Sequence, residues 1–150
     1  MIGWMTDVAE ADTYFNKRVS DAEWRNLDET KKEAALTHAY NRINNSPRFS
    51  IPASPTAAQL VKLAYAQCEM SNYLVIHLAE EDRRKGLQAQ GVISAGIVKE
   101  TYDKDMLTKL PFPPAVEELL EDFATEEVMA MIPIDRDENE TLESDVVEED

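Results

Sequence analysis

The side chains that could do catalytic or metal chemistry are few in this chain of 150 residues: two histidines, His38 and His77, and one cysteine, Cys68. His77 stands four residues before Glu81, so a helix would bring the two side chains onto one face, where they could hold a metal ion. We favour an ordinary contact on a helix surface for this pair. Cys68 falls on an apolar helical stripe, which predicts a buried and unreactive thiol.

Acidic pairs are the other possible site. Glu118 and Glu121 have the ExxE spacing with which all-helical pyrophosphatases hold magnesium, but no second pair of matching spacing is apparent. A solvated acidic face explains these carboxylates better. A phosphate-binding loop is not found either, because Gly86, Gly91 and Gly96 are five residues apart and no Lys-Ser/Thr follows them. We therefore expect a protein that is not an enzyme and that has no metal and no cofactor.

Charge divides the chain into two parts. Residues 117–150 hold 15 acidic residues and one basic residue, a net charge of −14, whereas residues 1–116 hold 15 acidic and 14 basic residues, a net charge of −1. A stretch of one charge sign repels itself and stays extended until a partner binds it. The sequence thus predicts a helical domain at residues 1–124 and an acidic C-terminal arm at residues 125–150. The overall charge of −15 argues against unspecific binding to DNA.

The longest helical pattern covers residues 54–84. Ser54 and Pro55 are typical of an N-cap and a first helical position. Apolar residues recur along this stretch at helical spacing and occupy well over a third of the circumference, so the helix must be covered on more than one side. No apolar run approaches the roughly 18 residues of a membrane span, and we expect no contact with a membrane. The fold class predicted is mainly α, a small helical bundle around one long helix.

Shorter helices are predicted on both sides of the long one. Thr6 or Asp7 and then Asp28 are placed as N-caps, and Pro113 and Pro114 precede a further amphipathic helix. The inward faces of these helices supply the core. The predicted core residues are Phe15, Trp24, Leu36, Ala39, Val61, Cys68 and Leu120.

Two further segments are predicted to meet other chains. Residue types that favour strands occur at residues 92–102, and a lone short hairpin there would be marginal in water unless it packed against helices or paired with another chain. In the acidic arm, an apolar patch lies between two acidic stretches and could dock in a groove. The predicted interface residues are Ile93, Ile97, Val98 and Tyr102 in the strand, and Val128, Met129, Met131, Ile132 and Ile134 in the arm.

The order of several segments forms a further pattern, which covers roughly residues 5–123. The segments are TDVAEADTYFNKR, AEWRNLDETKKEAALTHAYNRIN, a proline-bearing loop, a long Ala-rich helix, GVISAGIVKETYD and LPFPPAVEELLEDF. This order resembles the head-to-tail connector (adaptor or head-completion) proteins of tailed bacteriophages. Some relatives in phages carry the label putative DnaT-like single-strand binding protein. The shared motifs are those of helix pattern and order, without a catalytic signature.

The resemblance implies a structural protein of the virion, assembled in the cytoplasm of the bacterial host. Its helical subunit would form a homo-oligomeric ring, commonly of twelve copies, between the portal protein and a tail-side completion or stopper protein. Double-stranded DNA would pass through the ring without specific binding. The alternative is a small phage-encoded protein that binds single-stranded nucleic acid (DnaT-like). That function needs a basic groove with stacking aromatic residues, whereas the basic residues here are scattered or offset by acids.

Overall fold

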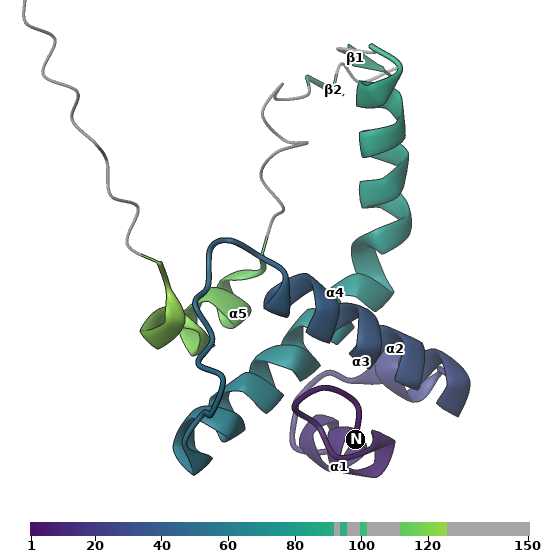
Figure 1. The fold of residues 1–150 in the computed structure, drawn as a ribbon. Coiled ribbons are helices and arrows are strands. Elements are labelled where there is room, and N and C mark those ends of the chain that lie inside the picture. The colour runs from purple at the N-terminus through teal and green to yellow at the C-terminus, as the bar shows by residue number, and fades with distance from the viewer. Residues whose placement is uncertain (92–93, 96–99, 102–111, 126–150) are drawn as a thin grey trace, which may run out of the picture.

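One long helix dominates the computed structural model, which describes residues 1–91, 94–95, 100–101 and 112–125 (Figure 1). This helix, α4, has 33 residues, whereas α3 has 16. The predicted mainly helical chain with one long helix is therefore confirmed. The elements are α1 (Val8–Phe15), α2 (Ala22–Arg25), α3 (Glu29–Asn44), α4 (Ala57–Ala89), β1 (Ser94–Ala95), β2 (Glu100–Thr101), α5 (Pro114–Leu119) and the 3-10 turn η2 (Glu121–Phe123).

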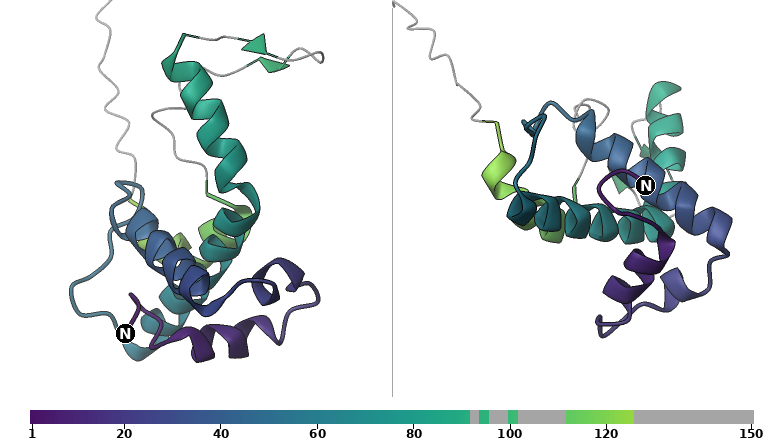
Figure 2. Two further views of the ribbon diagram at one scale, coloured as in Figure 1. Left: turned by 90° about the vertical axis from the view of Figure 1, so that its right-hand side faces the viewer. Right: turned by 60° about the horizontal axis from the view of Figure 1, so that its bottom comes forward.

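Helix α4 is bent partway along its length, and only its first part lies among the other helices (Figures 1 and 2). Leu74 is the last buried apolar residue of α4, so we call residues 57–74 its proximal part and residues 75–89 its distal part. No proline explains the bend. The buried hydroxyl of Ser71 donates a hydrogen bond of 2.7 Å to the carbonyl of Cys68, and such bonds compete with the helical ladder and bend helices.

The distal part carries a two-stranded pair at its far end. Gly91 follows the helix with a φ of +79°, a backbone conformation that glycine adopts without strain and that commonly ends helices. Strands β1 and β2 then pair antiparallel, with Ser94 opposite Thr101. The distal part and the strands together extend away from the helical body (Figure 2).

The N-termini of α1 and α3 follow the predicted caps, whereas that of α4 does not. Asp7 and Asp28 accept hydrogen bonds from the first turns of α1 and α3, as expected. The predicted N-cap of α4, Ser54, is wrong. Helix α4 begins at Ala57, and its N-cap is Thr56. Thr56 Oγ1 accepts from the amide of Gln59, and the Gln59 side chain accepts from the amide of Thr56. This reciprocal capping box determines where α4 starts.

Proximal α4 is buried on two sides. One side packs against α3, α5 and η2 through residues that include Leu63 and Met70, and another packs against α1 and α2 through Ala64 and Cys68. The aromatic rings of Phe15 and Trp24 stack with centroids 4.4 Å apart in this second cluster. Of the predicted core residues, six are at most 1% exposed: Phe15, Trp24, Leu36, Ala39, Cys68 and Leu120.

Val61 contradicts the predicted core, because half of it (50%) is exposed. It lies seven residues, about two helical turns, before Cys68 and therefore points in nearly the same direction. The cluster around α1 includes Ala64 and Cys68 but does not extend to Val61. Periodicity predicts the direction of a side chain correctly here, but not how far along the helix the covering elements reach.

Candidate assembly surfaces

An apolar strip on proximal α4 is exposed. Ala57, Ala58, Val61 and Tyr65 lie on one side of the helix, because Ala57 and Ala58 are each three, four, seven or eight residues from Val61 and Tyr65. Val61 and Tyr65 are 50% and 42% exposed. The strip is about 12 Å long at 1.5 Å per residue. We call these four residues the α4 face.

Helix α1 borders the α4 face at its C-terminal end. The rings of Tyr14 and Tyr65 lie 4.9 Å apart, and the Tyr14 hydroxyl donates a 2.5 Å hydrogen bond to Glu69 Oε1. Burial and this bond to a carboxylate both raise the pKa of Tyr14, so the phenol stays protonated. Arg18 Nη2 lies 3.2 Å from Glu69 Oε2. This border of the α4 face therefore ends in a basic group.

The end of the described chain borders a long side of the α4 face. Lys62 forms an ion pair with Asp122 of η2, which places the last helical turn beside proximal α4. The amide of Thr125 donates a 2.9 Å hydrogen bond to the carbonyl of Arg48. The chain is thus held against the loop between α3 and α4 up to its last described residue.

A buried ionic cluster anchors the distal part of α4 to α3. The guanidinium of Arg42 donates to both carboxylate oxygens of Glu81 at 2.7 and 3.2 Å, and Lys85 Nζ lies 2.5 Å from Glu81 Oε1. The Arg42 and Glu81 side chains are only 5% and 4% exposed. Burial would raise the pKa of Glu81, but the bonds from Arg42 and Lys85 outweigh it and lower the pKa, so the carboxylate stays charged.

Around this anchor the distal part of α4 presents an open surface. Ile76 is 45% exposed, and most residues from 76 to 89 are exposed or half-buried. Glu80 pairs with Arg83 and Arg84 within the helix, at 2.5 and 3.3 Å, and such exposed pairs add little stability. Contacts with another chain could cover this surface.

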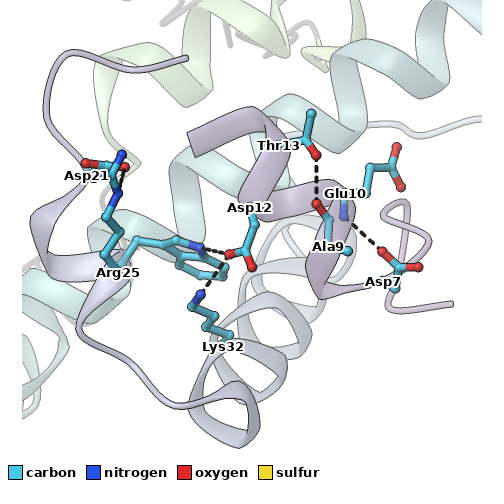
Figure 3. Close-up of polar contacts among 9 residues, drawn as sticks. Asp7, Ala9, Glu10, Asp12, Thr13, Asp21, Arg25 and Lys32 are labelled. Carbon is cyan, nitrogen blue, oxygen red and sulfur yellow. Dashed lines mark hydrogen bonds and ion pairs between the residues drawn. The ribbon is translucent and has the colours of Figure 1, made fainter. Parts of the chain in front are cut away.

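A polar network holds α1 against α2 and α3 (Figure 3). Asp12 Oδ1 accepts from Trp24 Nε1 at 2.7 Å and from Lys32 Nζ at 2.8 Å. Lys32 Nζ also lies 5.5 Å from the centroid of the Trp24 ring. Partial burial raises the pKa of Asp12, but the hydrogen bonds from Lys32 and Trp24 lower it by more. The network fixes α1, and with it Tyr14 and Arg18, beside α4.

Catalytic chemistry has little support in the part of the chain that the structure describes. No group of three or more His, Cys, Asp or Glu side chains there could hold a metal ion. Glu118 and Glu121 are both exposed, and the carboxylate of Glu81 is bound by cations of Arg42 and Lys85 rather than by His77. Burial raises the pKa of the Cys68 thiol.

Helices long and apolar enough to cross a membrane do not occur among the described residues.

The residues predicted to form interfaces lie outside the described ranges, so their positions stay predictions. They are Ile93, Ile97, Val98 and Tyr102 of the predicted strand, and Val128, Met129, Met131, Ile132 and Ile134 of the predicted arm.

Sequence reasoning missed the role of Gln67, which is fully buried on α4. Its Oε1 accepts from the amides of Trp4 and Met5 at 2.9 and 3.2 Å, and its Nε2 donates to the carbonyls of Ile2 and Leu36 at 2.7 and 2.9 Å. The signal that the sequence offered was a polar residue, glutamine, between the buried Ala66 and Cys68.

Comparison of the chain with protein-family models, with curated proteins and with solved structures found no match.

Proposed function

We propose that this protein is a subunit of a ring-shaped connector that joins the portal of a tailed-bacteriophage head to the tail and extends the DNA channel. The observation that carries the proposal is the distal part of α4, which leaves the helical body and is held by the buried Arg42–Glu81 pair. An extended element with an open surface is expected in a subunit that assembles. The segments that resemble connector proteins supply the kind of assembly.

A ring needs two different surfaces on each subunit. In a closed ring every contact is heterologous, so one patch of a copy meets another patch of the next copy. The distal part of α4 and the α4 face are two such patches on separate parts of the fold. Ile93, Ile97, Val98 and Tyr102 would extend the first patch toward the neighbouring subunit. Twelve copies is the number that the resemblance implies.

The acidic arm, residues 125–150, supplies the contact with the portal in this proposal. Its apolar residues Val128, Met129, Met131, Ile132 and Ile134 would dock on the portal, with an adjacent connector subunit as the second choice. A completion or stopper protein would bind the tail side. An acidic channel lining would let double-stranded DNA pass without adhering to it. The protein would act in the virion, as a structural component.

Binding of single-stranded nucleic acid is the competing function, and the ion pairs argue against it. Ten lysines and arginines of the described chain lie within 4.0 Å of a carboxylate. A phosphate backbone would have to displace these partners, and the counterion release that drives such binding would be small. A basic groove of the kind that tracks single strands is not formed by these paired residues.

The test is whether the distal part of α4 is needed for attachment to heads. Full-length protein is mixed with portal-bearing heads that lack it, and attachment is counted by electron microscopy. Ile76→Asp should reduce attachment about ten-fold or more, because it places a charge in a contact that must be desolvated. Val19→Asp is the matched control, since Val19 is fully exposed and lies between α1 and α2, outside the distal part of α4. Normal attachment of the Ile76→Asp protein would contradict the proposal.

A gel-shift measurement at low salt tests the competing function, binding of single-stranded nucleic acid. The connector proposal predicts no retardation of single-stranded DNA by the full-length protein. Retardation together with failure to attach to heads would establish the nucleic-acid-binding alternative.

A further inference from the structure

The α4 face has no covering element among the described residues, although parts of the body border it. Tyr14 and Arg18 border its C-terminal end, and the Lys62–Asp122 ion pair borders one of its long sides. We propose that in the free subunit residues 128–134 of the same chain lie on the α4 face and cover it. This inference does not rest on the connector proposal, because it concerns the isolated chain.

The last described residues lie at a place from which residues 128–134 can reach the α4 face. Asp122 binds Lys62, which directly follows Val61 in α4 and lies about 100° around the helix from it. Three residues later, Thr125 is still bonded to the carbonyl of Arg48. Nine further residues reach residue 134 and span up to about 30 Å when extended. That length is enough to pass around a helix about 10 Å wide and to follow the 12 Å strip of about two turns.

The residue types of this segment suit an apolar strip. Its sequence is VMAMIPI, without a charged residue. Two methionines adapt to an irregular surface, because their side chains are unbranched and polarisable. Pro133 removes a backbone donor and keeps Ile132 out of the helical region, which favours an extended segment. An extended segment would place alternate side chains on the α4 face.

Charge fixes the direction of the segment. Asp135, Asp137 and Glu138 follow the apolar residues. Arg18 stands at the α1 border of the α4 face with a third (33%) of its side chain exposed, and Lys17 beside it is exposed. A segment that enters from the Lys62 side and runs along the α4 face toward α1 would bring these acids to the two basic residues.

This contact would have a consequence for assembly. While the segment covers Val61 and Tyr65, the α4 face is closed to a second copy. Release of the segment toward another partner would open the α4 face at the same time. Self-association of free subunits would thus be suppressed until that partner is present.

The first experiment measures disulfide formation in the full-length chain carrying Val61→Cys and Met131→Cys, at low micromolar concentration under mild oxidation. Cys68 is fully buried, its pKa is raised, and it lies two helical turns from residue 61, too far for a bridge. We expect a bridge within one chain, formed about ten-fold faster than in a control protein with Ala34→Cys and Met131→Cys. Ala34 is exposed on α3. Equal rates in both proteins, or bridges only between chains, would overturn the proposal.

The second experiment needs no added cysteine. Met131→Asp with Ile132→Asp should free the α4 face, so binding of a hydrophobic dye and self-association should both rise several-fold. Val146→Asp with Val147→Asp adds the same charge near the C-terminus and should leave both measurements unchanged. Circular dichroism establishes that both proteins keep their helices. Equal behaviour of the two variants would overturn the proposal even if the disulfide experiment were spoiled by misfolding.

Discussion

The helical body and the distal part of α4 are stabilised in different ways. In the body, Phe15, Trp24 and Leu36 are almost completely buried, and Gln67 satisfies four backbone groups. Along α4 the buried apolar residues end at Leu74, and the distal part is anchored by a cluster of charged groups instead. Apolar burial is what makes a region stable on its own. The body is therefore expected to fold independently, and the distal part to gain its full stability from other chains.

The largest effect is expected from a cavity in the body. Trp24→Ala removes a side chain that stacks on Phe15 and donates to Asp12, and it should lower the free energy of unfolding by about 3–5 kcal/mol. Urea denaturation followed by circular dichroism measures the change. Val19→Ala, at a fully exposed position, should change it by less than about 0.5 kcal/mol. A loss below about 1 kcal/mol for Trp24→Ala would mean that the body lacks the core described here.

The next largest effect concerns the anchor. Glu81→Leu leaves the buried guanidinium of Arg42 without its carboxylate, which should cost about 3 kcal/mol, expressed as opening of the distal part. Hydrogen exchange of the amides of residues 77–89 should speed up, while exchange in α1 and α3 should stay slow. The double variant Arg42→Met with Glu81→Leu should regain most of the protection. If the double variant is as open as the single one, the ion pair is not what positions the distal part.

A third prediction addresses the polar centre of the body. Gln67→Leu keeps roughly the volume of the side chain but removes the acceptor of the amides of Trp4 and Met5 and the donor to the carbonyl of Leu36, so we expect a loss of about 2 kcal/mol. Thermal denaturation measures it. Gln90→Leu, at an exposed position after α4, is the matched control and should be nearly neutral. Equal stability of both variants would show that the N-terminal segment does not depend on Gln67.

The smallest effect is expected from pH. The pKa of Asp12 is lowered in the folded state, so its interactions stabilise the protein above the unfolded value near 3.8 and are lost as the pH falls through the lower folded value. Because the Asp12 side chain is 40% exposed, its contribution should stay below about 1 kcal/mol. Acid denaturation of Asp12→Asn should be shallower than that of the wild type in this window. Identical acid curves would contradict the role of Asp12.

Much of the local structure follows from residue types and spacing. Asp7 and Asp28 are caps because their short carboxylates reach the free amides of a first turn, and a single sequence reveals this. The mainly helical class and the long helix follow from the period of apolar residues. Thr56 was missed as a cap because Ser54 and Pro55 carry a similar signal, and only the partner Gln59 distinguishes them.

The features that depend on contacts between distant segments could not be predicted. Val61 and Cys68 have the same helical phase, yet only Cys68 is covered, because the extent of α1 along α4 is decided by tertiary packing. The pair of Arg42 and Glu81 joins residues 39 positions apart, and neither side chain carries a local signal for burial. The bend that takes the distal part of α4 out of the body has no proline to signal it in the sequence.

Hydrogen exchange of the full-length protein, alone and after attachment to portal-bearing heads, tests most directly whether the distal part of α4 is an assembly element. In the free protein, amides of residues 82–89 should exchange much faster than those of α3 and proximal α4. After attachment, residues 82–89 should become protected by ten-fold or more, about 1.4 kcal/mol, while the body changes little. Strong protection of the distal part already in the free chain, or unchanged exchange after mixing with heads, would contradict this division of the molecule.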